Sequence, residues 1–307
     1  MLAALALVLL LEGCTAVEKV AVGPFYQVAP LPPEAGSVMT DLAYFEGDDA
    51  HTEKHRLDLY RPAGSGWPIL VFVHGGSLEN GDKALRIGGF DIYGNVGRFY
   101  AARGVGVAVV NYRLQPEVRW PEQADDVARA IAWVQRHARD YGSSGELFLS
   151  GHSAGAWLAA HAILDETRAK RFDLGPDSVE GFISVSGSGY DLTDRETWQT
   201  FGREKAWEKR FATNEARDDW RERASVLPLL GGPDLPPFLL VYTSKEWPAL
   251  GRQNQLMREA LVKAGAGVKL VALETDSHRR MVLAMSRADK RLSGEILSFI
   301  QDPYPVP

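Results

Sequence analysis

The sequence predicts an α/β protein with one mostly parallel sheet and helices on both of its faces. Short, continuous apolar runs recur along the chain, as in strands that are buried on both faces. Segments with a helical apolar period separate several of these runs, and such alternation is the pattern of a parallel sheet with crossover helices. The 307 residues fit one large α/β domain.

The first half of the chain supplies the expected strands and helices in this order. Residues 38–46 and 55–60 alternate apolar and polar side chains, as half-exposed edge strands do. The runs at 69–73 and 105–110 are uniformly apolar and predict buried strands. Residues 122–140 place their apolar side chains on one helical stripe, so we expect a helix there.

The second half continues the alternation. A strand at 146–150 leads into an alanine-rich apolar helix at 154–164. The later buried strands are expected at 182–186, 238–242 and 268–273, with helices at 249–263 and 288–300.

Residues 191–232 interrupt this pattern. The segment is charged, contains three tryptophans and lies between two expected buried strands. It is too long for a plain loop, so we expect a cap-like insert of short helices over the carboxyl-terminal edge of the sheet. Ligands bind at that edge in open parallel sheets, although a packing role without ligand contact is equally open.

The first residues read as an export signal. Residues 1–11 are uniformly apolar, which is too short to span a bilayer but suits the core of a signal peptide. Leu11, Gly13 and Cys14 resemble a bacterial lipobox, in which the cysteine is lipidated; a plain secretory signal is the alternative. We therefore expect a signal peptide at 1–13, an extended tether at 14–37 and the domain at 38–307. The expected location is periplasmic or at the cell surface, outside a bacterial cytoplasm.

Composition excludes several classes. The net charge of −6 argues against a nucleic-acid-binding protein, which would show a basic balance. A single cysteine excludes an intramolecular disulfide framework and a cysteine-based zinc site. The sequence His51-Thr-Glu-Lys-His55 suggests a metal site, but its glutamate is one place late for H-E-x-x-H. We interpret it as a solvated turn and expect no metal.

Residues 151–155, Gly-His-Ser-Ala-Gly, match the G-x-S-x-G pattern of a nucleophile elbow. The pattern alone is weak, but here it joins an expected strand to an expected helix, which is the setting the motif requires. The tight turn leaves no room for bulk two residues to either side of Ser153. We expect Ser153 to be the nucleophile, at a corner where a helix N-terminus faces developing negative charge.

The expected strand at 69–73 is followed directly by His74-Gly-Gly-Ser77. Glycines let backbone N–H groups approach and point at a substrate oxygen. We expect the amides of Gly75, Gly76 and Ala154 to form an oxyanion hole, and His74 to hold the loop.

The base and the acid follow from chain order. Of the seven histidines, only His278 lies beyond all the expected strands, where the order Ser, acid, His requires the base. The acid should follow the strand at 238–242, and Glu246 is the next acidic residue. Asp191, after the strand at 182–186, is the alternative acid. The carboxylate would hold the imidazole tautomer and stabilise the imidazolium.

With these motifs in this order, the sequence resembles members of the α/β-hydrolase superfamily. The resemblance covers residues 38–301 and is greatest to its carboxylesterase branch, which includes hormone-sensitive-lipase-like, feruloyl/acetyl-xylan-esterase-like and kynurenine-formamidase-like proteins. Besides the two glycine motifs it rests on Asn111-Tyr-Arg113-Leu, on Trp120-Pro before Asp125-Asp126, and on Ser188-Gly-Tyr-Asp191. At the position of the acid, this sequence has Ser-Lys-Glu246-Trp, whereas members of the superfamily usually have Gly-x-x-Asp. Arg113 is expected to pair with Asp125 or Asp126 beneath the active-site floor.

The resemblance implies an eight-stranded sheet and a cofactor-independent serine carboxylesterase acting on small or medium esters. An arylformamidase, which would use the same residues on an N-formyl group, is one alternative. A non-catalytic binding lipoprotein on the same scaffold is another, and a peptidase is disfavoured because no larger cap is present. The side chains expected to line a pocket, if they are not core, are Leu78, Trp157, Trp207 and Trp247.

Overall fold

The computed structural model describes residues 22–31, 36–201, 204–212, 219–231, 234–245, 247–274 and 277–303. The expected signal peptide, Cys14 and Glu246 lie outside these ranges. The described residues contain an eight-stranded sheet in the order β1-β2-β6-β3-β7-β8-β9-β10. The strands are β1 (Gly36–Ala43), β2 (Arg56–Pro62), β3 (Trp67–Val73), β6 (Gly106–Val110), β7 (Ser143–His152), β8 (Gly181–Val185), β9 (Phe238–Thr243) and β10 (Val268–Leu273).

The sheet is parallel from β6 to β10, whereas β2 pairs antiparallel with both β1 and β6. The expected mostly parallel sheet is therefore confirmed. The expectation that residues 55–60 form a half-exposed edge strand is wrong, because β2 lies between two strands and most of its residues are buried. Its one acidic residue, Asp58, is buried. The cost of burying this carboxylate is offset because the Lys83 ammonium donates to it at 2.7 Å.

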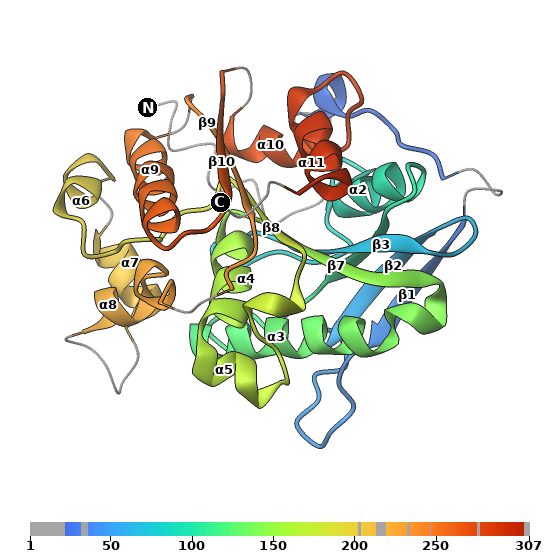
Figure 1. The fold of residues 1–307 in the computed structure, drawn as a ribbon, viewed down its shortest axis with the longest axis horizontal. Helices are drawn as coiled ribbons and strands as arrows, with labels where there is room; N and C mark the ends of the chain where they lie inside the picture. The colour runs from blue at the N-terminus through green and yellow to red at the C-terminus, as the bar shows by residue number, and fades with distance from the viewer. Residues whose placement is uncertain are drawn as a thin grey trace.

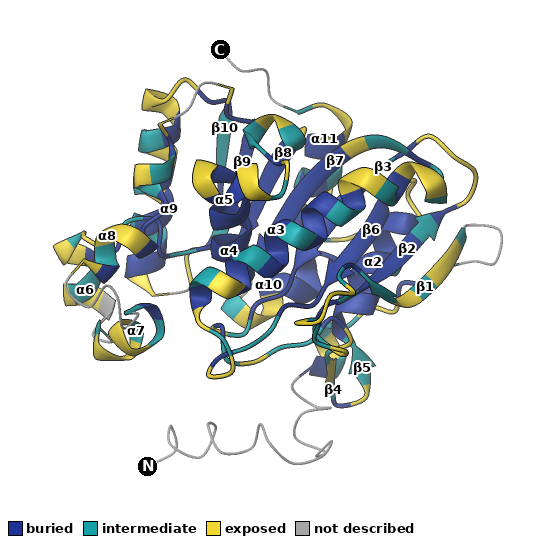
Figure 2. Ribbon diagram, turned by 90° about the horizontal axis from the view of Figure 1, so that it is seen from below, coloured by how far each residue is buried: buried dark blue, intermediate teal, exposed yellow. Residues whose placement is uncertain are grey.

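Helices cover both faces of the sheet (Figures 1 and 2). On one face lie α3 (Trp120–His137), α4 (Ala154–Leu164) and α5 (Glu166–Arg171). On the other lie α2 (Ile92–Ala101), α10 (His278–Ala284) and α11 (Arg291–Gln301), and each face has its own apolar cluster. The helix α9 (Pro248–Lys263) connects β9 to β10. These layers bring the carboxyl ends of the parallel strands to one edge of the molecule.

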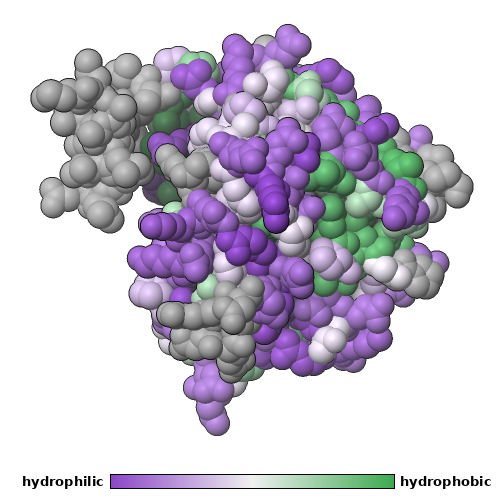
Figure 3. All heavy atoms as spheres, turned by 90° about the vertical axis from the view of Figure 1, so that its left-hand side faces the viewer, coloured by the Kyte–Doolittle hydropathy of each residue, from purple (hydrophilic) through white to green (hydrophobic). Residues whose placement is uncertain are grey.

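The segment expected as an insert is helical, with α6 (Arg195–Phe201), α7 (Glu204–Phe211) and α8 (Trp220–Ala224). Its apolar side chains pack onto α4, where the ring centroids of Trp157 and Phe211 are 4.8 Å apart. The indole N–H of Trp157 also donates to the Ala224 carbonyl at 2.9 Å. Hydrophilic side chains cover most of the outer face of this region (Figure 3). The insert is thus fixed to the domain through aromatic side chains.

Residues 22–31 fall within the segment expected as a tether and contact the domain. The buried side chain of Asn95 on α2 accepts from the Ala29 amide at 2.7 Å and donates to the Gln27 carbonyl at 2.8 Å. The hydroxyl of Tyr26 donates to the Asp91 carbonyl at 3.0 Å. This part of the chain therefore packs as part of the domain.

A cluster of three charged or titratable residues, His55, Arg113 and Asp126, joins helix α3 to the loops beside β2 and β6. Arg113 donates to both carboxylate oxygens of Asp126, at 2.9 and 2.8 Å, so the expected pairing of Arg113 is confirmed. His55 is also buried and lies 3.0 Å from Asp126, so the expectation of a solvated turn at His55 is wrong. Burial raises the pKa of Asp126, but hydrogen bonds from His55 and Arg113 outweigh it and lower that pKa. The carboxylate is therefore charged and fully engaged in the fold.

Candidate active site

Ser153 occupies a sharp turn between β7 and α4. Its backbone has φ 55° and ψ −124°, a conformation that side-chain-bearing residues rarely adopt. The Ser153 amide donates to the Val185 carbonyl at 2.9 Å, which ties the turn to the neighbouring strand β8. The strand–turn–helix setting expected from the sequence is therefore present.

The positions around the turn must be glycine because other backbone segments pass too close to them for a side chain. A Cβ on Gly151 would collide with the backbone of Ala156, and one on Gly155 with the carbonyl groups of Val73 and His74. A Cβ on Gly75 would lie 2.8 Å from the His152 carbonyl oxygen. The elbow and the loop after β3 are thus in direct contact, and only glycine fits at these points.

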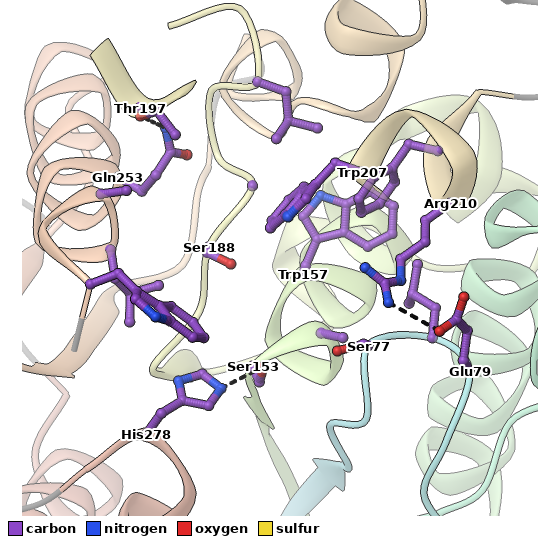
Figure 4. Close-up of a pocket in the computed structure, with 18 of the residues that line it drawn as sticks. Ser77, Glu79, Ser153, Trp157, Ser188, Thr197, Trp207, Arg210, Gln253 and His278 are labelled. Atoms are coloured by element: carbon purple, nitrogen blue, oxygen red, sulfur yellow. Dashed lines mark hydrogen bonds and ion pairs between the residues drawn. The ribbon is translucent and has the colours of Figure 1, made fainter. Parts of the chain in front are cut away.

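His278 and Ser153 meet across 125 residues of sequence. His278 is the first residue of α10, after β10, and its Nε2 lies 2.9 Å from the Ser153 Oγ (Figure 4). At this distance the hydroxyl can donate its proton directly to the imidazole. The structure brings the expected nucleophile and the expected base together.

Of the two candidate acids, Glu246 and Asp191, only Asp191 lies in a described part of the chain. Glu246 lies outside the described residues. The Asp191 carboxylate accepts from the Thr193 amide at 2.9 Å and from its hydroxyl at 2.6 Å, and so caps its own turn. This geometry gives Asp191 a local structural role, and Glu246 stays the preferred candidate by its position after β9.

The loop after β3 carries three consecutive residues with positive φ, at Gly76, Ser77 and Leu78. Strained backbone of this kind clusters at functional sites. Ser77 and Ala154 line the cavity described below. Gly75, Gly76 and Ala154 therefore remain the three candidate oxyanion donors.

His152, inside the elbow, contacts the base. Its Nε2–H donates to the His278 carbonyl at 3.0 Å, and the two ring centroids are 5.0 Å apart. Burial and the neighbouring His278 lower the pKa of His152 to about 3, so its ring is neutral. The side chain that precedes the nucleophile thus holds the main chain of the base.

Replacing His152 tests this contact. Loss of one hydrogen bond of about 1 kcal/mol corresponds to about fivefold in rate if it acts on the placement of His278. We expect His152→Met to lower kcat by about that factor, and His152→Gln, whose amide N–H can reach the same carbonyl, to recover most of the loss. Steady-state kinetics on an activated ester measure both. Wild-type kcat in His152→Met would show that the contact is dispensable.

Three buried imidazoles couple the fold to pH. Burial lowers the pKa of His74 to about 4, and lowers the pKa values of His152 and His161 to about 3. The unfolded chain takes up protons at these sites near pH 6.5, whereas the folded chain does not. The unfolded state therefore binds more protons below pH 6.5, and the stability contributed by the neutral rings is lost as the pH falls toward 4.

We accordingly expect the free energy of unfolding to fall below pH 6.5, by up to about 1.4 kcal/mol per pH unit for each of these histidines. Denaturant unfolding at pH 7.5, 6 and 5 measures the slope. His161→Gln retains a donor for the Ala224 carbonyl, which His161 contacts at 3.2 Å, and should show a shallower slope. Equal stability at pH 7.5 and pH 5 would contradict the expectation.

A cavity of about 600 Å³ opens above Ser153 and His278. Its volume is within the range of small-molecule sites. All four side chains expected to line a pocket do so, and Trp247, whose ring centroid is 5.7 Å from that of His278, is 45% exposed at the rim. The other aromatic side chains of the lining are Trp198 and Phe211. The arrangement suits an organic substrate with an apolar part.

An ion pair at the cavity was not expected from the sequence. Arg210 on α7 donates to Glu79 of the oxyanion loop at 3.0 Å, so an ion pair joins the insert to the loop (Figure 4). On the other side of the cavity, Gln253 donates to the Thr197 hydroxyl at 2.8 Å. These groups give the cavity polar walls on two sides.

Comparison with known proteins agrees with this geometry. A family model described as alpha/beta hydrolase fold matches residues 70–282, which is more than half of the chain. The chain is 26% identical over 273 residues to esterase LipQ of Mycobacterium tuberculosis, covering 85% of this chain and 61% of that protein. It is 26% identical over 250 residues to an isoprenylcysteine alpha-carbonyl methylesterase of Arabidopsis thaliana, covering 75% and 55%. The chain thus spans less than two thirds of these relatives.

Solved structures show the same fold. Esterase B from Lactobacillus rhamnosis superposes with a TM-score of 0.70 over 93% of this chain and 89% of that chain, at 20% sequence identity. A truncated carbohydrate esterase from gut microbiota gives a TM-score of 0.68 over 89% and 98%, at 16% identity. At these identities the likeness concerns the fold.

Proposed function

Because the chain belongs to the alpha/beta hydrolase family, we propose that it is a serine carboxylesterase that hydrolyses small or medium esters through an acyl-enzyme. The observation that carries the proposal is the 2.9 Å contact between Ser153 Oγ and His278 Nε2 at a strained strand-to-helix turn, beneath a cavity of about 600 Å³. The names of the two esterase relatives above support the ester as substrate class.

In the acylation half of the reaction, the Ser153 Oγ attacks the ester carbonyl carbon and its proton passes to His278 Nε2. The carbonyl π electrons move to oxygen, and the amides of Gly75, Gly76 and Ala154 are the proposed donors to this oxyanion. The tetrahedral intermediate then expels the alcohol, which takes the proton from His278. Glu246 is the proposed partner that stabilises the imidazolium.

The deacylation half repeats these steps with water. His278 takes a proton from the water as the water oxygen attacks the acyl carbon, and the same amides hold the second oxyanion. Collapse releases the carboxylic acid and returns the proton to Ser153. No metal or cofactor is proposed for either half.

A panel of esters tests the function. We expect hydrolysis of p-nitrophenyl acetate and butyrate, because the cavity has room for a short acyl group beside an aromatic leaving group. Octanoyl and feruloyl esters then define acyl preference, and an N-formyl aryl substrate tests the arylformamidase alternative. Inactivity on all five would favour a non-catalytic binding protein. Activity on the N-formyl substrate alone would replace the esterase proposal.

We further propose that the protein is exported and that Cys14 carries a lipid anchor. The apolar run at 1–11 and the lipobox-like sequence support this. In the part of the chain that the structure describes, no helix combines the length and apolarity needed to cross a membrane.

Cys14→Ser should move the protein from the membrane fraction into the soluble fraction, because the thiol is the attachment point. Fractionation of expressing bacteria with immunoblotting measures this. A wild-type protein that is already soluble and begins downstream of Cys14 would leave only the plain signal peptide.

A further inference from the structure

The helix that carries the base is short and rests on a distant part of the chain. Helix α10 has seven residues and begins at His278 itself. Figure 1 shows the blue segment near the N-terminus beside the red helices α10 and α11. The side chains of Val22 and Ala29 belong to the same apolar cluster as the inner face of α10.

Phe25 makes the first set of contacts. The guanidinium of Arg280, two residues after the base, lies 3.6 Å from the centroid of the Phe25 ring. Arg287, in the turn after α10, donates to the Phe25 carbonyl at 3.2 Å. A guanidinium over an aromatic face is attracted by the ring, and the attraction is stronger where the pair is desolvated. The segment thus holds α10 near its beginning and beyond its end.

Asn95 makes the second connection. Besides its bonds to Gln27 and Ala29, its side-chain N–H donates to the Ser286 hydroxyl at 2.9 Å. Asn95 is 1% exposed, and its bonds to Ala29 and Ser286 are buried. One buried amide on α2 therefore joins the N-terminal segment to Ser286, in the turn that follows α10.

We infer that residues 22–31 are a positioning element for the base: they hold α10, and through it they keep the imidazole of His278 at Ser153. Catalytic groups must be kept within about 0.5 Å of productive geometry, and a displacement of about 1 Å can cost 10²-fold in rate. His278 is the first residue of α10, so movement of the helix is passed to the ring. The inference rests on the proposed function, because it assigns the segment a role in that reaction.

Phe25→Ala tests the inference, with Phe25→Tyr as the conservative variant. The matched control is Arg103→Ala, which removes another stack of 3.6 Å, between Arg103 and Phe99 after α2. Active sites are counted by titration with an alkyl phosphonate, so that kcat refers to competent molecules. We expect Phe25→Ala to lower kcat per titrated site about tenfold with KM nearly unchanged, Phe25→Tyr to restore it, and Arg103→Ala to leave it unchanged.

Melting temperature and hydrogen exchange complete the experiment. A purely structural role would lower the melting temperature and the number of titrated sites without changing kcat per site, and that result would overturn the inference. Exchange in residues 278–286 should be faster in Phe25→Ala and unchanged in Arg103→Ala. If the wild-type protein neither turns over an ester nor reacts with phosphonate, the proposed function fails, and exchange in 278–286 alone decides whether the segment holds α10.

Discussion

Ser153→Ala should lower kcat by about 10⁶-fold, the loss seen when the nucleophile of a serine-protease triad is removed. The substitution deletes the oxygen that lies 2.9 Å from His278 and forms the acyl-enzyme. Folding should be retained, because the hydroxyl is at a turn facing the cavity. Initial rates on p-nitrophenyl butyrate, together with the melting temperature, measure the two effects separately.

The matched control is Ser144→Ala, the same substitution at the opposite end of β7 from the elbow. Ser144 hydrogen bonds to Glu146 and to the Trp67 carbonyl, away from the cavity. It should retain wild-type kcat. If Ser153→Ala keeps more than a small fraction of activity while folded, Ser153 is not the nucleophile.

Glu246→Gln should lower kcat by about 10²–10⁴ with little change in KM. Replacing the triad carboxylate by its amide costs about 10⁴ in the serine-protease template, because the amide favours the wrong imidazole tautomer. KM should hold, because the role proposed for Glu246 is to act on His278 and not on the substrate. Steady-state kinetics on one activated ester, with melting temperatures, measure the effect.

Asp191→Asn is the comparison that identifies the acid. The Asp191 carboxylate caps its own turn through Thr193, so its amide should cost far less in rate. Both variants should be assayed side by side. If Asp191→Asn strongly lowers kcat and Glu246→Gln leaves it nearly normal, the acid is Asp191, in the loop after β8, and not Glu246.

The sequence predicts the parallel strands of the sheet well because each contains a compact apolar run. The run at 268–273 coincides with β10, and the helix at 154–164 coincides with α4. Helix α2 has no such signal: it contains two glycines, and Gly97 lies against the Tyr60 ring, where a Cβ would collide. The N-cap Asp91, which accepts from the Gly94 amide, is the one local signal that marks its start. Helix α10 is too short for a periodicity to be recognised.

The contact between Ser153 and His278 could be predicted because motif and chain order specify both residues, whereas long-range polar partners could not be predicted. His55 is buried through Asp126, 71 residues away, and nothing near His55 in the sequence indicates that partner. Arg210 and Glu79 are 131 residues apart and come together only once the insert packs over the loop. Such pairs form only through tertiary packing, so they cannot be predicted from local sequence patterns.

The central claim is that Ser153, activated by His278, is the acylated nucleophile. Covalent labelling with a p-nitrophenyl alkyl phosphonate, followed by peptide mass spectrometry, tests it most directly. We predict one phosphonyl group per chain, located on Ser153, and labelling that is much slower in His278→Ala. Labelling of a different serine, or none at a concentration that inactivates an ordinary serine esterase, would contradict the account.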